Sequence, residues 1–313
     1  MYEKNKTYQH IPVLCQEAVS GLSIKSEGTY VDATHGGGGH AQKIMSELGH
    51  KGSLYAMDKD PHASEKKSKT TTLDSKNSPK FVYIKENFIN LKNSLFLHKI
   101  HKIDGLLADL GMSSLQIDNP ERGFSFRFAG PLDMRMDTQQ SLTAEEVINK
   151  YSFPALRHIF STYGELRQAP KIARIILEAR EKNTISNTEQ LKNILRPLYK
   201  QKNMNSFRAQ FFKAIRIEVN GEMKALEKLL NDSQELIKKD GRIVVISYHS
   251  LEDRRVKQFL KNGQFAREPL RDPYGNLNVP FQPLHNKPIK PSPQEIIKNP
   301  RARSAKMRVG VKL

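Results

Sequence analysis

Four consecutive glycines at residues 36–39 follow a β-prone run at 29–34, and this feature constrains the fold most strongly. Glycine lets a backbone turn sharply and approach a ligand closely. The helix expected at 39–48 then begins with free N–H groups and the positive end of its dipole, where a carboxylate or a phosphate binds. A strand, a glycine loop and a helix in this order predict a ligand site at one edge of a sheet.

The first third of the chain alternates between β-prone and helical segments. Short apolar runs separated by helices are typical of parallel sheets built from βαβ units. We expect strands at residues 29–34, 53–57, 81–85 and 103–110, with helices at 39–48, about 61–70 and about 88–99. The sequence therefore predicts an α/β fold with a mostly parallel sheet.

The middle of the chain has a different pattern, without strand character between residues 114 and 205. Helix signals there are the capping box Thr143-Ala-Glu-Glu146, Pro154, the apolar spacing of 171–180 and Ser186-Asn-Thr-Glu189. Alternation then resumes with a helix at 222–238, a turn at Asp240-Gly241, a strand at 242–247, a proline-rich loop at 269–300 and an edge-type strand at 305–313. We predict one α/β domain, residues 1–113 and 213–313, interrupted by a helical domain at 114–212.

The charge of the chain predicts a polyanionic partner. Its 313 residues include 51 Lys and Arg against 33 Asp and Glu, a net charge of +18. Residues 254–313 alone carry 14 basic and three acidic side chains. Nucleic acid is the usual partner of so basic a protein. The polar N-terminus, the lack of a long apolar run and the single cysteine predict a cytoplasmic protein without membrane contact or disulfides.

Acidic residues end three of the expected strands. Asp58 follows the second strand and is suited to accept hydrogen bonds from ribose hydroxyls, while Asp109 ends the fourth. The glycine loop also fits a dinucleotide fingerprint, so a nicotinamide-dependent oxidoreductase is one alternative. Asp32, directly before the loop, would repel a pyrophosphate but tolerates a cationic sulfonium and an ammonium. This favours S-adenosyl-L-methionine over a nicotinamide cofactor.

Several motifs in order along the chain resemble one family, the bacterial 16S ribosomal RNA cytosine-N4 methyltransferases. They are residues 10–14, 32–40, 109–114, 122–126, 130–137, 214–220, 247–254 and 299–304. The resemblance implies a class I S-adenosylmethionine-dependent methyltransferase (Rossmann-like) with an inserted helical domain. It implies a cytosine in the decoding region of small-subunit rRNA as methyl acceptor, and the assembled subunit as substrate. Leu115 and Gln210 depart from the family pattern. Leu115 stands where proline is common, so the conformation of the loop around Gln116 can differ from that in the family.

The resemblance also implies a set of cofactor contacts, which are Gly38, Gly39, His40, Asp58, Phe88, Asp109 and Gln116. The amine of cytosine is a poor nucleophile because its lone pair is delocalised, so catalysis relies on positioning and on an acceptor for the amine. Asp109, a backbone carbonyl within 110–113, or His249 are the candidate acceptors, and the sequence does not rank them. We expect no metal, since the pair His98 and His101 lacks acidic or cysteine partners nearby.

Two basic segments are candidates for RNA contact. Arg122, Phe124, Phe126 and Arg127, followed by Phe128, interleave cations and aromatic rings, as in segments that stack bases, but a buried hairpin fits the same pattern equally well. Arg301 and Arg303, with Lys306 and Arg308, are expected to contact phosphates. An RNA-binding ribosome assembly factor that is catalytically inactive is the alternative to an enzyme, and the oligomeric state stays open.

Overall fold

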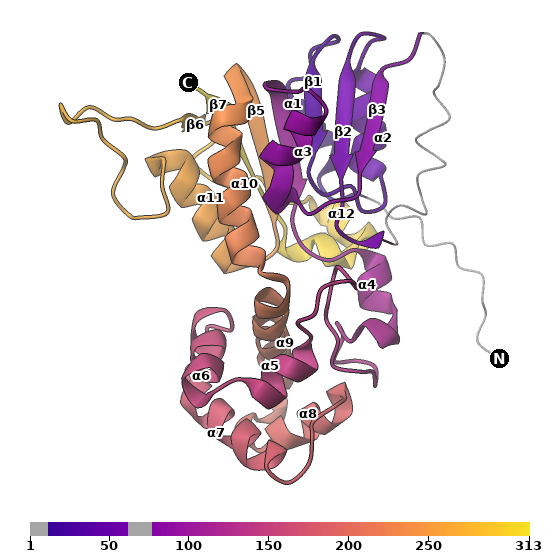
Figure 1. The fold of residues 1–313 in the computed structure, drawn as a ribbon, viewed down its shortest axis with the longest axis vertical. Helices are drawn as coiled ribbons and strands as arrows, with labels where there is room; N and C mark the ends of the chain where they lie inside the picture. Colours follow the sequence, from indigo (N-terminus) through magenta and orange to yellow (C-terminus); the bar gives the residue numbers. More distant parts are fainter. Residues whose placement is uncertain (1–11, 62–76) are drawn as a thin grey trace. The chain divides into compact units, whose positions relative to one another are not determined.

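The structure of the protein is a computed structural model that describes residues 12–61 and 77–313 (Figure 1). The chain divides into two compact units. The first, called the α/β unit here, comprises Met1–Gly111 and Lys224–Leu313, and the second, the helical unit, comprises Met112–Met223. The boundary expected at residue 212 falls inside a continuous helix, α9 (Met204–Asn220). Most of the helix expected at 61–70 lies outside the described residues.

A seven-stranded sheet in the order β3-β2-β1-β4-β5-β7-β6 forms the centre of the α/β unit. The first five strands in that order are parallel, whereas β7 is antiparallel to β5 and to β6. The strands are β1 (Thr29–Asp32), β2 (Ser53–Met57), β3 (Lys80–Ile84), β4 (Ile103–Asp109), β5 (Ile237–Ser247), β6 (Phe281–Pro283) and β7 (Lys306–Lys312). The order reverses between β1 and β4, and open α/β sheets bind ligands beyond the carboxyl ends of the strands at such a point.

Two sequence predictions at the far side of the sheet are wrong. The strand expected at the sheet edge, β7, has neighbours on both sides, and the short β6 within the proline-rich segment is the edge. The turn expected at Asp240-Gly241 lies inside β5, where Asp240 has a φ of 65°. The pairing of β4 with β5 shifts register here, so an irregularity within the strand takes the place of the turn.

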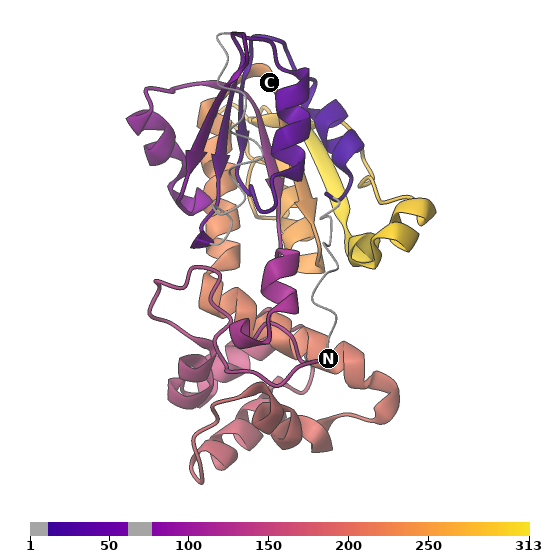
Figure 2. The same ribbon diagram turned by 90° about the vertical axis from the view of Figure 1, so that its right-hand side faces the viewer.

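Helices cover both faces of the sheet (Figure 2). On one face, α1 packs against α2 and the central strands. On the other, α3 and α10 are joined by an ion pair between Lys92 and Glu235. The helical segments of this unit are α1 (Cys15–Leu22), α2 (Gly39–Glu47), η2 (Phe88–Asn90), α3 (Leu91–Leu97), α10 (Glu222–Leu236), α11 (Ser250–Asn262), α12 (Pro293–Lys298) and η6 (Pro300–Ser304). Because both faces are covered, the central strand β4 is buried along almost its whole length.

The helical unit has its own apolar core, in which Phe160 stacks on Phe211 with ring centroids 4.7 Å apart. The predicted capping box Thr143–Glu146 is confirmed at the start of α5. The start expected at Ser186 is wrong by one residue, because Asn187 caps α8. The unit contains α4 (Ser114–Asp118), η3 (Pro120–Arg122), α5 (Ala144–Lys150), α6 (Phe153–Thr162), α7 (Ala169–Arg180), α8 (Thr188–Leu195), η4 (Arg196–Leu198), η5 (Gln201–Asn203) and α9.

Candidate cofactor site at the strand ends

The glycine loop joins β1 to α2 in a conformation that requires glycine. Gly36 and Gly38 have φ values of 51° and 79°, in the left-handed region. A Cβ on Gly39 would lie 2.8 Å from Cγ of Pro12, so any side chain there would collide. Gly38 is the N-cap of α2 and supplies no side-chain hydrogen bond. The first N–H groups of α2 therefore remain available to an anionic ligand.

Asp58, directly after β2, braces the glycine loop from the neighbouring strand end. Its Oδ2 accepts a hydrogen bond from the Gly36 N–H at 2.7 Å, and its Oδ1 accepts one from the Asp60 N–H at 2.8 Å. Burial raises the pKa of this carboxyl. Since two carboxylate oxygens offer about four lone pairs, Asp58 keeps acceptor capacity for ligand hydroxyl groups.

Asp32 carries the clearest sign of a missing partner. The residue is fully buried, and its Oδ1 accepts from the Thr34 N–H at 3.1 Å. Its Oδ2 is buried and has no hydrogen-bond partner in the described part of the chain. Burial raises the pKa of Asp32 to about 6. Because a buried carboxylate oxygen is costly without a donor or a cation, this position fits a ligand ammonium group.

Asp109, at the end of β4, lies among three other polar side chains. Its N–H donates to Oγ1 of Thr34 at 2.7 Å, and its Oδ1 accepts from the hydroxyl of Tyr248 at 2.9 Å. Its Oδ2 lies 3.8 Å from Nδ1 of His40. Burial raises the pKa of Asp109 to about 7. A partly buried carboxyl with two fixed neighbours and one open oxygen can accept a hydrogen bond from a ligand amine.

His40, in the first turn of α2, is held by a backbone carbonyl. Its Nε2 lies 3.0 Å from the carbonyl oxygen of Val13. A carbonyl only accepts hydrogen bonds, so Nε2 carries the proton and Nδ1 is left as the acceptor when the ring is neutral. Burial lowers the pKa of His40, which favours that neutral form.

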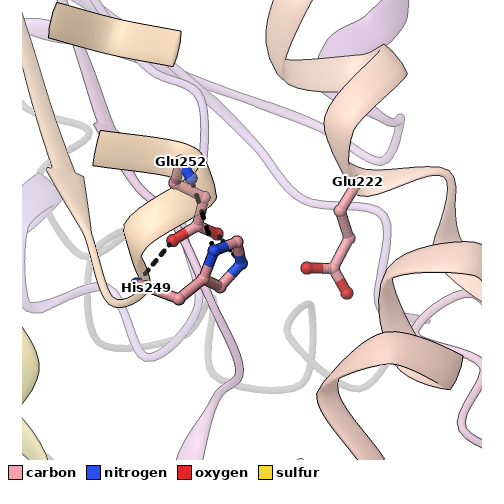
Figure 3. A group of neighbouring side chains, drawn as sticks. All are labelled: Glu222, His249 and Glu252. Carbon is pink, nitrogen blue, oxygen red and sulfur yellow. Dashed lines mark hydrogen bonds and ion pairs between the residues drawn. The ribbon is translucent and has the colours of Figure 1, made fainter. Parts of the chain in front are cut away.

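His249 caps a helix rather than facing Asp109 directly. Figure 3 shows its ring against Glu252, three residues later in the capping box of α11. Nδ1 of His249 accepts from the Glu252 N–H at 3.3 Å, and Nε2 lies 3.1 Å from Glu252 Oε1. Oε2 of Glu252 accepts from the N–H groups of Tyr248 and His249. Glu222, also drawn in Figure 3, is paired with Arg216 at 2.8 Å. The box thereby fixes the backbone of Tyr248, whose hydroxyl group donates to Asp109.

The remaining cofactor candidates lie on two different units. Phe88 is partly buried and opens η2, just after β3 and its N-cap Asn87. Gln116 belongs to the helical unit, where its Oε1 accepts from the Ser113 N–H at 3.0 Å in the capping box of α4. The α/β unit itself holds Gly38, Gly39, His40, Asp58 and Asp109 at the carboxyl ends of β1, β2 and β4.

The candidate RNA contacts divide into buried and exposed residues. Arg122 is buried, and its guanidinium donates to the carbonyl groups of Arg135 and Met136 at 2.8 and 3.1 Å. Phe124 belongs to the core of the helical unit, and Phe126 is half-buried, edge-on to Phe212. Arg127, Phe128, Arg301 and Arg303 are exposed, whereas Arg308 pairs with Asp253 at 2.7 Å and Lys306 approaches the same carboxylate.

Sequence reasoning missed two residues of the site, Thr34 and Tyr248. A usable signal existed for Tyr248, which directly follows β5, the parallel neighbour of the strand that Asp109 ends. The carboxyl ends of adjacent parallel strands meet at one edge of a sheet, so the two side chains could have been placed together. Thr34 gave no such signal, because its role depends on the path of the glycine loop.

A mostly parallel seven-stranded sheet, with a glycine loop after β1 and acids at the ends of β1, β2 and β4, defines a Rossmann-like class I methyltransferase. The model of the MraW methylase family matches residues 7–313, and the chain belongs to that family. The methyl donor is therefore S-adenosyl-L-methionine, as the motifs predicted. In the described part of the chain, no helix is both long and apolar enough to cross a membrane.

Curated relatives match the chain over nearly its full length. A ribosomal RNA small subunit methyltransferase H from Amoebophilus asiaticus is 48% identical, covering 98% of this chain and 97% of its own length. Proteins of the same name from Flavobacterium johnsoniae and Bacteroides fragilis are 48% and 44% identical, covering 97% and 100% of this chain and 98% and 100% of their own lengths. Among solved structures, an rRNA methylase from Streptococcus thermophilus aligns with a TM-score of 0.38 at 12% identity, covering 96% of this chain and 95% of that one.

Proposed function

We propose that this protein transfers a methyl group from S-adenosyl-L-methionine to N4 of a cytosine in the decoding region of 16S rRNA, position 1402 in the family. The methyl acceptor follows from the family and from the relatives' names, and one structural observation supports binding of the methyl donor. The buried, unpartnered Oδ2 of Asp32 and the uncapped start of α2 lie on the same loop. Together they are complementary to an ammonium and a carboxylate on one carbon, the amino-acid end of the methyl donor.

Each part of the donor has a matching group in the chain. The N–H groups of Gly39 and His40 would bind the carboxylate, and Asp32 the ammonium. Gly38, whose own N–H donates to the carbonyl of His35 at 2.8 Å, would shape the turn in front of them. Asp58 would accept from the ribose hydroxyls, and Phe88 would contact the adenine. Gln116, in the helical unit, is assigned to the cofactor by the family resemblance alone. When bound, S-adenosyl-L-methionine supplies an electrophilic methyl group on a sulfonium sulfur.

Asp109 is the proposed acceptor for the cytosine amine. Its Oδ1 is occupied by the Tyr248 hydroxyl, which leaves Oδ2 for the substrate amine. An acceptor in a buried site favours the pyramidal amine that attacks the methyl carbon, without solvent reorganisation. His249 stays a second candidate, and its contacts with Glu252 support a role in holding Tyr248.

The His249→Ala variant tests that role. Loss of an N-cap should lower the free energy of unfolding by about 1 kcal/mol, while affinity for the methyl donor stays unchanged. His249→Asn is the matched control, because asparagine is a good N-cap and should restore stability. Denaturant unfolding and methyl-transfer kinetics on both variants give the answer. If both variants lose methyl transfer although His249→Asn is as stable as the wild type, the imidazole itself is catalytic.

The target is proposed to be 16S rRNA within the assembled small subunit, which would place the protein in the cytoplasm. The cytosine must leave its base stack to reach a methyl donor in the crevice. Exposed Arg127 and Phe128 are suited to stack and hold single-stranded RNA, and Arg301 and Arg303 to contact phosphates.

Replacing both Arg301 and Arg303 with glutamine should weaken RNA binding mainly through electrostatics. Each lost phosphate contact should reduce the slope of log K against log salt by about 0.7 to 0.9, so the pair should reduce it by up to about 1.8. Titrations of rRNA fragments at several salt concentrations measure the slope, and calorimetry should show unchanged affinity for the methyl donor. An unchanged slope would show that these two arginines do not contact phosphates of the RNA.

The function as a whole is tested by deleting the gene and analysing nucleosides of small-subunit rRNA by mass spectrometry. We expect one N4-methylcytidine to disappear, to return with the wild-type gene and to stay absent with Asp109→Asn. Restoration by the Asp109→Asn variant would show that Asp109 is not needed for the reaction. Persistence of the modification in the deletion strain would refute the proposed reaction.

A further inference from the structure

We propose that Glu295 of α12 is a positioning residue, which acts through the peptide group between Val13 and Leu14 to fix the imidazole of His40. The relevance of this contact to methyl-donor binding rests on the proposed function. The contact itself lies wholly within the α/β unit and joins residues 281 positions apart in the sequence.

A single peptide group connects Glu295 to the site. The N–H of Leu14 donates to Oε1 of Glu295 at 2.7 Å, and the carbonyl of Val13 faces Nε2 of His40 at 3.0 Å. This N–H and this C=O belong to the same planar peptide and point in opposite directions. A continuous chain of hydrogen bonds therefore runs from the carboxylate through the peptide to the imidazole, and Nδ1 on the far side of the ring lies 3.8 Å from Asp109.

The conformation of Leu14 needs the partner that Glu295 provides. Leu14 has a φ of 52° and a ψ of 36°, a left-handed conformation that residues other than glycine rarely adopt. The residue is fully buried, so its N–H cannot turn to water instead. A hydrogen bond to a charged acceptor is among the stronger kinds. Glu295 is itself held at the start of α12, where its N–H donates to Oγ of Ser292 at 3.1 Å.

Fixing this peptide also fixes the protonation pattern of His40. A carboxylate at the N–H end polarises the peptide and strengthens its carbonyl as an acceptor. That carbonyl keeps the proton on Nε2 and leaves the lone pair of Nδ1 facing Asp109. With Glu295 removed, the peptide can rotate, and the ring loses the group that selects its tautomer.

The test compares Glu295→Ala with the wild-type chain by nitrogen-15 NMR of the histidine side chains at pH 8. The His40 signals are assigned from the spectrum of His40→Asn. We expect Nε2 protonated in the wild type and a mixture of tautomers in Glu295→Ala. Affinity for S-adenosyl-L-methionine, measured by calorimetry without RNA, should fall about five- to tenfold, as expected for loss of one hydrogen bond.

Two matched variants separate positioning from a general loss of structure. Glu295→Gln keeps an accepting oxygen and should retain the tautomer, with affinity within about twofold of the wild type. Gln294→Ala alters the adjacent exposed residue and should change neither the tautomer of His40 nor the affinity for S-adenosyl-L-methionine. If Glu295→Ala does not fold, Glu295→Asp keeps the charge but withdraws it by one methylene, and the same shift in tautomer is expected.

Unchanged His40 signals and unchanged affinity in a folded Glu295→Ala or Glu295→Asp would overturn the inference. A lower melting temperature with the tautomer retained would also overturn it, because Glu295 would then be purely structural. Failure of methyl transfer to 16S rRNA would refute the proposed function but not this inference, since neither the NMR spectrum of His40 nor the calorimetry involves RNA.

Discussion

Asp109→Asn is expected to slow methyl transfer strongly and, at pH 8, to make the unliganded protein more stable. The asparagine keeps an oxygen for the Tyr248 hydroxyl, and its amide can donate toward Nδ1 of His40. It cannot supply a charged acceptor for the cytosine amine. We expect kcat to fall about 100- to 1,000-fold, the range for loss of one preorganised group at the reacting centre.

The gain in stability follows from the raised pKa of Asp109, about 7 in the folded protein. Between about pH 4 and pH 7 the folded state holds this proton and the unfolded state releases it. The free energy of unfolding therefore decreases as pH rises through that window. Removing the ionisable group should recover on the order of 1–4 kcal/mol at pH 8, at about 1.36 kcal/mol per pKa unit.

Asp104, on the same strand, provides a control with the opposite sign. Burial opposes ionisation of Asp104, but hydrogen bonds from Lys238 and from the Thr29 N–H, together with the charges of Lys238 and Lys25, outweigh burial and lower the pKa. Asp104→Asn should therefore reduce stability at pH 8 and leave kcat unchanged. Denaturant unfolding at pH 5 and pH 8 measures both variants. An Asp109→Asn variant that is less stable than wild type at pH 8, or fully active, would contradict the role assigned to Asp109.

Asp32→Asn is expected to weaken binding of S-adenosyl-L-methionine by roughly 100-fold. Removing one partner of a buried charge pair costs about 3 kcal/mol or more, which corresponds to that factor. The asparagine preserves an acceptor for the Thr34 N–H, so the loop should keep its conformation. Because burial raises the pKa of Asp32 to about 6, the unliganded variant should be at least as stable as the wild type at pH 8.

The choice of ligand makes this experiment specific. S-adenosylhomocysteine retains the ammonium and should lose affinity like the methyl donor itself. Methylthioadenosine lacks the whole amino-acid part, so Asp32→Asn should bind it as well as the wild type does. Calorimetry with the three ligands gives the comparison. If Asp32→Asn loses as much affinity for methylthioadenosine as for the other two ligands, Asp32 holds the loop in shape and does not bind the ammonium.

The sequence was sufficient for the elements that local patterns specify. The strand expected at 53–57 coincides with β2, and those at 29–34, 81–85 and 103–110 lie within two residues of β1, β3 and β4. Short apolar runs bounded by turn residues mark buried parallel strands well. The acids at the strand ends could also be predicted, because the carboxyl ends of parallel strands share one edge of the sheet.

Features that depend on distant partners could not be predicted. The alternation of residues 305–313 resembles an edge strand, and only the pairing with β6 makes β7 an interior strand. Arg122 and Phe124 are buried because carbonyl groups and apolar side chains of the helical unit surround them, which their own spacing does not encode. The contact between Leu14 and Glu295 likewise has no local signal.

The most direct test of the cofactor site is a crystal structure of the protein with S-adenosylhomocysteine and cytidine. We expect the ligand carboxylate on the N–H groups of Gly39 and His40, its ammonium within hydrogen-bonding distance of Asp32 Oδ2 and its ribose on Asp58. The cytidine amine should face Oδ2 of Asp109. Electron density for S-adenosylhomocysteine at any other edge of the sheet, with Asp32 Oδ2 still unpartnered, would contradict the proposed cofactor site.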